Sequence, residues 1–224
     1  MTSISTGSAS LDKMLDGGVR VGVLTDVFGA SASGKTQLCF ELCVNCTKPK
    51  NKGGLDANAL FIDATNTFRP ERILSIARSN DINSNILDKI YLQRVYSSED
   101  QIRAIERIPS MRDLKLVIVD SISDLFSFEY KQSLAAEKHM RFMQMMRQLA
   151  AYAVNCDIAV VVTNNVRSGG GEQTEYLGRS ISSYAHVKIA ISKENSVFKA
   201  KLLYPALESR TALFKITEKG ITDV

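Results

Sequence analysis

A glycine-rich segment near the amino terminus has the residue types and spacing that bind phosphate groups. Residues 29–36 read Gly-Ala-Ser-Ala-Ser-Gly-Lys-Thr and match G-x-x-x-x-G-K-[ST] at every fixed position. Glycines let the backbone curl so that consecutive amides point at phosphates, and the start of the following helix adds partial positive charge. Lys35 is expected to reach the β- and γ-phosphates, and the Thr36 hydroxyl to ligate Mg²⁺. The residues expected to contact the nucleotide here are Gly29, Ala30, Ser31, Ala32, Ser33, Gly34, Lys35, Thr36 and Gln37.

A carboxylate at the end of an apolar run fits the same chemistry. Residues 116–120 read Leu-Val-Ile-Val-Asp. Such a strand, ending in one aspartate, holds the Mg²⁺ shell in nucleotide-binding proteins. Alone, an aspartate at a strand end is often only a turn former. Together with the phosphate-binding segment, Asp120 is predicted to act beside Thr36 in binding Mg²⁺, with ATP as the nucleotide.

Three cysteines suggest a different chemistry, that of an iron–sulfur cluster. Cys39, Cys43 and Cys46 have the spacing C-x-x-x-C-x-x-C. They fall on the helix expected after the phosphate-binding segment, where residues i, i+4 and i+7 mark one face. We therefore interpret them as buried thiols that pack like small hydrophobic groups. His139 and His186 lack acidic or cysteine partners at ligand spacing, so the sequence predicts no other metal site.

Short apolar runs alternate with helical patterns over most of the chain. The expected strands are 23–28, 60–63, 90–95, 116–120 and 158–163. The expected helices are 8–16, 35–45, 69–79, 99–107 and 134–154. The strand runs look too apolar for half-exposed edges, which predicts an α/β fold with a mostly parallel central sheet and helices on both faces. The polar stretch 169–183 is expected to be a mobile loop. Three close strands after it predict an antiparallel edge: 187–192, 197–203 and 211–216.

Length and composition fit one ordered domain, expected to span 1–224. The chain has 224 residues, 45% hydrophobic and 23% charged, the balance of a globular protein that buries a core. No apolar run approaches the ~20 residues of a membrane helix, and the amino terminus lacks signal-peptide features. We therefore expect a cytoplasmic protein. The formal charge of +4 permits contact with nucleic acid without requiring it.

Four segments together resemble the RecA/RadA recombinases, and within them the small archaeal RadB paralogs. They are 5–18, 24–37, 161–165 and the run 61–72, which reads Phe-Ile-Asp-Ala-Thr-Asn-Thr-Phe-Arg-Pro-Glu-Arg. The similarity covers nearly the whole chain, and Phe-Arg-Pro-Glu-Arg after a strand makes it specific. It implies a RecA-like P-loop core with a carboxy-terminal antiparallel edge. It also implies a protein of homologous recombination and DNA repair that binds ATP, Mg²⁺ and DNA.

The same resemblance implies roles for residues outside the phosphate-binding segment. Arg72 takes the place of an arginine that stacks on adenine. Asn165 takes the place of a glutamine that couples the γ-phosphate to a DNA-binding loop, so Lys35 and Asn165 are the expected catalytic residues. Two loops, 130–138 and 167–182, correspond to the family's DNA-facing loops. Their expected phosphate contacts, independent of base sequence, are Lys131, Lys138, Arg167 and Arg179.

Departures from the family pattern bear on catalysis and assembly. The active recombinases carry a water-activating glutamate at the position of Thr65, and neither Thr65 nor Asn66 accepts a proton at neutral pH. Asp63 sits deeper on the same strand and is a weak substitute. The family's nucleotide-capping proline falls on Glu208. The chain starts at the core, and its Phe-x-x-Ala match, residues 61–64, lies on an expected buried strand, so a filament of the usual kind is not expected.

The leading hypothesis is a RadB-like accessory or mediator protein in which ATP sets the conformation and hydrolysis is very weak. Its implied partners are single-stranded DNA and a RadA-type recombinase, with no membrane. Two alternatives stay open: a DNA-stimulated ATPase that uses another base, and a RecA-fold regulator of a non-DNA process, as in the clock or motility ATPases.

Overall fold

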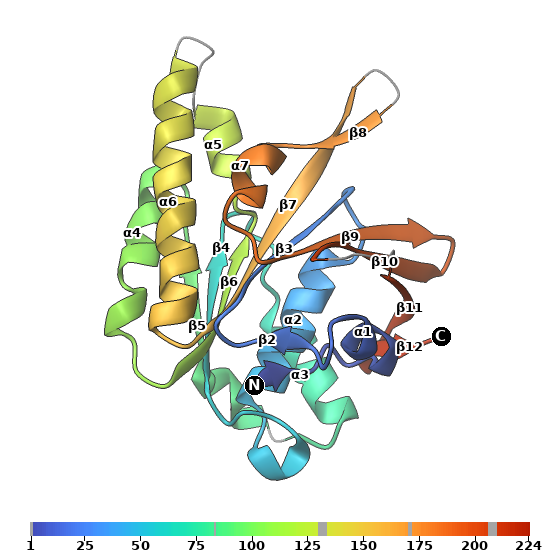
Figure 1. The fold of residues 1–224 in the computed structure, drawn as a ribbon. Coiled ribbons are helices and arrows are strands. Elements are labelled where there is room, and N and C mark those ends of the chain that lie inside the picture. The colour runs from blue at the N-terminus through green and yellow to red at the C-terminus, as the bar shows by residue number, and fades with distance from the viewer. Residues whose placement is uncertain (1, 83, 130–133, 170–171, 206–209) are drawn as a thin grey trace.

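The fold is a single large sheet with helices on both faces (Figure 1). The computed structural model describes residues 2–82, 84–129, 134–169, 172–205 and 210–224. The strands are β1 (Ser3–Ile4), β2 (Val19–Arg20), β3 (Leu24–Gly29), β4 (Asn58–Asp63), β5 (Ile90–Arg94), β6 (Leu114–Asp120), β7 (Ala159–Gly169), β8 (Glu172–Glu175), β9 (Val187–Glu194), β10 (Val197–Tyr204), β11 (Arg210–Thr217) and β12 (Gly220–Asp223). The α-helices are α1 (Ala9–Met14), α2 (Lys35–Thr47), α3 (Pro70–Ser79), α4 (Ser98–Glu106), α5 (Asp124–Glu129), α6 (Ala135–Asn155) and α7 (Gly178–Ser182).

The strand order confirms the predicted α/β class. Within the described ranges the main sheet runs β12-β11-β10-β9-β3-β7-β6-β4-β5, and β8 pairs with β7 alone. Strands β3 to β7 pair in parallel, and β9 pairs in parallel with β3. From β9 to β12 the pairing is antiparallel. The mostly parallel sheet with an antiparallel carboxy-terminal edge therefore has the form of a RecA-like core.

Two hydrophobic cores lie on opposite faces of the sheet because side chains alternate along each strand. Phe61 and Ile118 point into the core formed with α2 and α3. Ile62 and Val119, the next residues along their strands, point into the core formed with α4, α5 and α6. Burial on both faces explains why these strands are continuous apolar runs. Among the described residues, no helix has both the length and the apolar character needed to cross a membrane.

The three cysteines of α2 belong to the first of these cores. Cys39, Cys43 and Cys46 are fully buried and free, and burial raises the pKa of the Cys43 thiol well above its ordinary value. Across the described part of the chain, no group of His, Cys, Asp and Glu is arranged to hold a metal ion. Because all three side chains are buried in this core, the thiols pack as small apolar groups, as the helical spacing predicts.

The segment 90–95 is not the covered strand that its composition predicts. It forms β5, which lies at one edge of the sheet, and Tyr91 and Leu92 are 45% and 38% exposed. Apolar content does not determine strand order, which depends on pairing between distant segments. The prediction that this strand is covered on both faces is wrong.

The polar stretch 169–183 includes residues 170–171, which lie outside the described residues, and its described part is more ordered than predicted. Strand β7 extends to Gly169 because its last residues pair with β8, with Val166 opposite Glu175. Helix α7 follows, and Ser180 Oγ lies 3.3 Å from His139 Nδ1 of α6. Backbone pairing, rather than apolar burial, builds this two-stranded arm, so hydrophobicity alone does not reveal it. The arm and the end of α6 that follows α5 rise from the same edge of the sheet (Figure 1).

The carboxyl ends of the parallel strands bring polar residues together at that edge. Gly29 at the end of β3 is in register with Asn165 of β7. Asp63 at the end of β4 is in register with Asp120 of β6. Ligands of open α/β sheets bind at this edge, so the candidate site begins here.

Candidate nucleotide-binding site

The phosphate-binding loop joins the end of β3 to the start of α2, as the sequence predicts. Gly34, the residue before α2, has φ +97°, a left-handed conformation that favours glycine. A Cβ atom at Gly34 would lie 2.9 Å from Ile216 Cδ1, and one at Gly29 would lie 2.1 Å from the Ile191 carbonyl oxygen. The backbone of β9 therefore leaves no room for a side chain at Gly29, and the left-handed conformation favours glycine at Gly34.

Lys35 lies at the base of this loop and is only 7% exposed. Its Nζ donates hydrogen bonds to the carbonyl oxygens of Gly29 and Ala30, at 2.8 and 2.9 Å. Burial lowers the pKa of the Lys35 amine, while the nearby carboxylates of Asp120 and Asp124 oppose that shift. The loop therefore holds an ammonium group beside the amides of the α2 amino terminus, an arrangement suited to phosphate oxygens.

Thr36 and Asp120 form the expected pair of hard oxygen groups. Thr36 Oγ1 donates to Asp120 Oδ2 at 2.7 Å, and Thr163 Oγ1 donates to the other carboxylate oxygen. Burial raises the pKa of the Asp120 carboxyl, and the hydrogen bonds from the two threonines oppose that shift.

The donor set at this pair fits Mg²⁺ bound together with a nucleotide. Mg²⁺ usually takes one or two protein oxygen ligands and completes its shell with phosphates and water. The hydroxyls of Ser33, three residues before Thr36, and of Ser121, directly after Asp120, are buried and have no hydrogen-bond partner among the described residues. Unsatisfied buried hydroxyls of this kind mark a place where a polar ligand restores the missing bonds.

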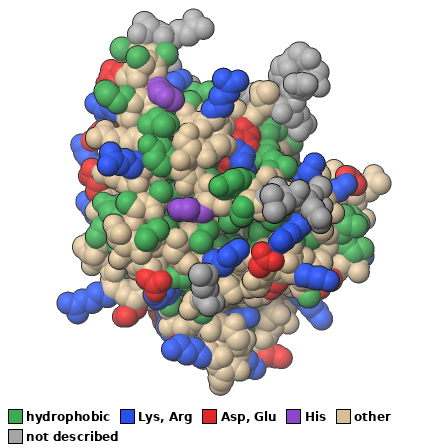
Figure 2. Space-filling view, in the orientation of Figure 1, with side chains coloured by type: hydrophobic (Ala, Val, Ile, Leu, Met, Phe, Trp, Pro, Cys, Tyr) green, Lys and Arg blue, Asp and Glu red, His purple; other side chains and the backbone are tan. Residues whose placement is uncertain are grey.

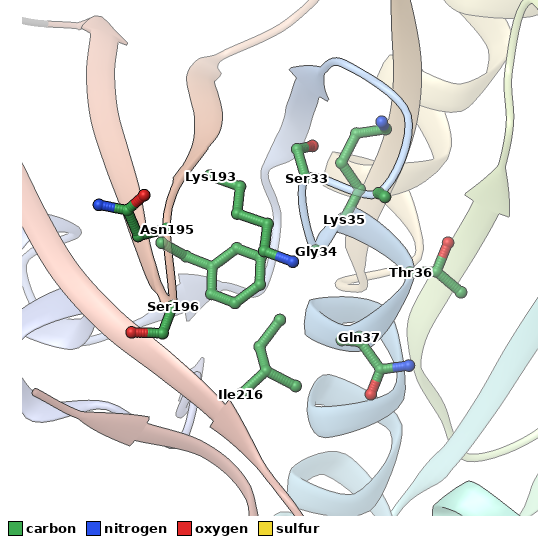
Figure 3. Close-up of a pocket in the computed structure, with 11 residues that line it drawn as sticks. Ser33, Gly34, Lys35, Thr36, Gln37, Lys193, Asn195, Ser196 and Ile216 are labelled. Carbon is green, nitrogen blue, oxygen red and sulfur yellow. The ribbon is translucent and has the colours of Figure 1, made fainter.

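A cavity of about 670 Å³ opens beside the loop (Figure 3). This volume is within the usual range for small-molecule sites. One side is formed by loop and helix residues, and the opposite side by the β9–β10 hairpin and β11. The lining residues are Ala32, Ser33, Gly34, Lys35, Thr36, Gln37, Lys193, Asn195, Ser196, Phe198 and Ile216. The hairpin and β11 residues belong to no sequence motif of the loop, because only the folded sheet brings them to it.

Arg72, the expected adenine-stacking residue, lies near this cavity and is fixed by three hydrogen bonds. Its Nε donates to Gln37 Oε1 at 2.8 Å. Its two terminal nitrogens donate to the carbonyl oxygens of Thr217 and Glu218, at 2.6 and 3.0 Å. The guanidinium group thus joins α2, α3 and the β11–β12 turn. Because Gln37 lines the cavity, Arg72 is positioned at its border.

The end of β4 carries no free carboxylate for activating water. Asp63 is 1% exposed and accepts hydrogen bonds from the backbone amides of Thr65, Thr67 and Phe68, at 3.0–3.2 Å. Its carboxylate therefore holds the loop after β4 in shape. Thr65, at the position of the family's glutamate, lies 2.7 Å from the Thr67 hydroxyl.

Asn165, the expected sensor residue, is bonded to a carboxylate that sequence reasoning missed. Its Nδ2 lies 3.1 and 3.2 Å from the two carboxylate oxygens of Asp124, the first residue of α5. Asp124 also acts electrostatically on Lys35. The only sequence signal is its position four residues after Asp120, since α5 was not predicted.

The four residues expected to contact DNA are only partly placed by the structure. Arg179 is exposed on α7. Lys138 is half-buried on α6, and its Nζ donates to Tyr176 Oη at 2.7 Å, which joins α6 to the segment after β8. Lys131 and the side chain of Arg167 lie outside the described residues. On the face in Figure 2, basic side chains are interspersed with acidic ones, so surface charge does not itself mark a DNA site.

A buried ion cluster lies beneath the arm. Asp26 of β3 is 0% exposed, and its Oδ2 lies 3.4 Å from Lys188 Nζ of β9. The same ammonium lies 2.6 Å from Glu175 Oε2 at the end of β8. Burial and, secondarily, the charge of Glu175 raise the pKa of Asp26 to about 7, although Lys188 acts in the opposite direction.

Comparison with known proteins places these features in one family. The Rad51 family model matches residues 1–224. The DNA repair and recombination protein RadA of Cenarchaeum symbiosum is 34% identical over 235 residues, covering 98% of this chain and 58% of the relative. DNA repair protein RAD51 homolog B of Zea mays and DNA repair protein RAD51 homolog 1 of Arabidopsis thaliana are each 35% identical. They match 99% and 98% of this chain, which spans 69% of each.

Proposed function

The chain belongs to the Rad51 family, and from that premise we propose that it is an ATP- and DNA-binding protein of recombinational DNA repair. Its role is that of a RadB-like accessory or mediator protein acting with a RadA-type recombinase in the cytoplasm. ATP serves mainly as a ligand that sets the conformation, and hydrolysis is very weak.

The observation that carries this proposal is the combination of a complete phosphate-binding loop with the lack of a free carboxylate among the described residues at the end of β4. Lys35, Thr36 and Asp120 form the set needed to bind a triphosphate with Mg²⁺. At the end of β4, Asp63 is occupied by backbone amides and Thr65 has no carboxylate. Such a site favours binding over turnover, because a general base typically contributes ~10²- to 10⁴-fold in rate.

The position of the arm and α7 supports the DNA-binding part of the proposal. Lys138 is tied to Tyr176, close to the arm, and Arg179 is exposed on α7. The arm and α7 lie at the edge of the sheet that carries the phosphate-binding loop (Figure 1). We expect contacts with DNA phosphates, which are independent of base sequence and weaken steeply with salt.

A titration of labelled single-stranded DNA tests the proposal. Fluorescence anisotropy is measured with and without Mg-ATP, at low and at moderate salt. We expect modest affinity that rises with Mg-ATP and falls at the higher salt concentration. ATP binding without any DNA binding at either salt concentration would contradict the repair role and favour a RecA-fold regulator of a non-DNA process.

A further inference from the structure

A lysine of the β9–β10 hairpin faces the cavity beside the phosphate-binding loop. Lys193 is directly opposite Phe198 in the hairpin register, so the two side chains lie on the same face of the sheet. Lys193 Nζ is 5.6 Å from the centroid of the Phe198 ring. Both residues line the cavity together with Gly34. Figure 3 shows Lys193 extending from the hairpin toward the loop.

The location of this lysine is unusual for its strand. Ile189 and Ile191 precede it on the same face of β9, and both are buried in the core. Lys193 is the next residue on this face of β9, and it lines the cavity instead of packing in the core. Phe198 and Ile216 continue the apolar surface below it. The cavity therefore has an apolar wall on the hairpin side and an ammonium group at its rim.

Electrostatics favour a phosphate partner for this ammonium group. The amine of Lys35 is already bonded to two loop carbonyls, whereas Lys193 is exposed and forms no ion pair among the described residues. The adjacent Glu194 lies 3.9 Å from Lys199 Nζ. A lysine at the end of a flexible stem, with three rotatable donors, meets a phosphate chain as a point charge.

We propose that Lys193 is a second nucleotide-binding lysine, which closes the cavity from the same chain by contacting the phosphates of a nucleoside triphosphate. Phe198 and Ile216 form the apolar wall beside the bound nucleotide. The assignment rests on the proposed function, since it presupposes that the loop binds ATP. It gives the β9–β10 hairpin a role in closing the site that does not depend on Glu208, which lies outside the described residues.

Calorimetric titration of the full chain with Mg-ATP tests the assignment. Lys193→Gln removes the charge and keeps most of the side-chain length. Lys199→Gln is the matched control, because Lys199 lies on the same hairpin but points to the opposite face, one residue after Phe198. We expect Lys193→Gln to weaken Mg-ATP binding about five-fold at low salt, which corresponds to about 1 kcal/mol, and Lys199→Gln to change it less than about two-fold.

Two further measurements separate charge from packing. Lys193→Arg keeps the charge and is expected to retain affinity within about two-fold of the wild type. The loss in Lys193→Gln should shrink at high salt, because salt screens an exposed charge.

The outcomes distinguish this assignment from the proposed function. Equal Mg-ATP affinities for Lys193→Gln and the wild type, or an equal loss in Lys199→Gln, would overturn the role of Lys193 and leave nucleotide binding intact. A wild-type protein that does not bind Mg-ATP would overturn both.

Discussion

Replacing Thr65 with glutamate tests directly why this site should bind ATP without efficient turnover. Thr65 follows β4 and is half-buried, close to the edge where the phosphate-binding loop and Asp120 lie. Its hydroxyl contacts the Thr67 hydroxyl at 2.7 Å. A glutamate here supplies a carboxylate that can accept a proton, while Asp63 continues to hold the surrounding loop through backbone amides.

The size of the expected increase in the hydrolysis rate depends on the other groups of the site. A positioned general base contributes ~10²- to 10⁴-fold in rate. The gain should lie at or below the bottom of that range, because the Asn165 amide is bonded to Asp124 and a γ-phosphate must compete with that carboxylate for it. We expect hydrolysis to rise about ten- to hundred-fold. Loss of the Thr65 hydroxyl contact should cost about 1 kcal/mol of stability.

Single-turnover hydrolysis of radiolabelled ATP, with protein in excess, measures rates this slow. Thr65→Gln is the control, because glutamine has nearly the same size and cannot act as a base. Mg-ATP affinity should stay within about three-fold in both variants. A wild-type protein that turns over several ATP molecules per minute, with no change in Thr65→Glu, would show that the base lies elsewhere and that the interpretation of the site is wrong.

The remaining predictions concern binding and stability. Lys35→Ala should weaken Mg-ATP binding at least about ten-fold by calorimetry, because it removes a charge-assisted phosphate contact. Asp124→Asn should strengthen the same binding about two- to five-fold, since the carboxylate competes with phosphates for Lys35. Arg179→Glu should weaken single-stranded DNA binding in anisotropy titrations, whereas Arg78→Glu on α3 should not. Asp26 keeps its proton in the fold to about pH 7, so urea unfolding should show wild-type stability falling relative to Asp26→Asn, by at most about 3 kcal/mol, as pH rises from 5 to 8.

Much of the fold could be predicted because local patterns determine it. The phosphate-binding segment is continuous in sequence, so its loop and the following helix could be predicted. Helix α2 ends at Thr47, two residues later than expected. The central strands were found because burial on both faces makes them continuously apolar. Strand order was not accessible in the same way, and β5 is an edge strand despite its composition. The arm of β7 and β8 was missed because polar residues form it through backbone pairing.

The site was predictable where short local motifs, each ending a strand, contain its residues. Lys35, Thr36 and Asp120 come together as expected because two strand ends meet at one edge. The partners of Arg72 and Asn165 come from distant segments, Thr217 for the former and Asp124 for the latter. A sequence motif records which residue is present but not which distant group is bonded to it. For the same reason the residues of the β9–β10 hairpin that line the cavity could not be predicted from the sequence.

Under the proposed function, the pairing of β3 with β7 connects ATP binding to the arm without requiring hydrolysis. β3 ends in the phosphate-binding loop, and β7 continues past Asn165 to form the arm with β8. A ligand shifts a protein between two conformations only if its contacts differ between them. Asn165 can provide such a difference, because its amide donates to Asp124 and a γ-phosphate would compete for the same donor. Under the proposed function, exchange of that one hydrogen bond at the base of the arm depends on the presence of the γ-phosphate and not on its hydrolysis, so this response does not require a general base at Thr65.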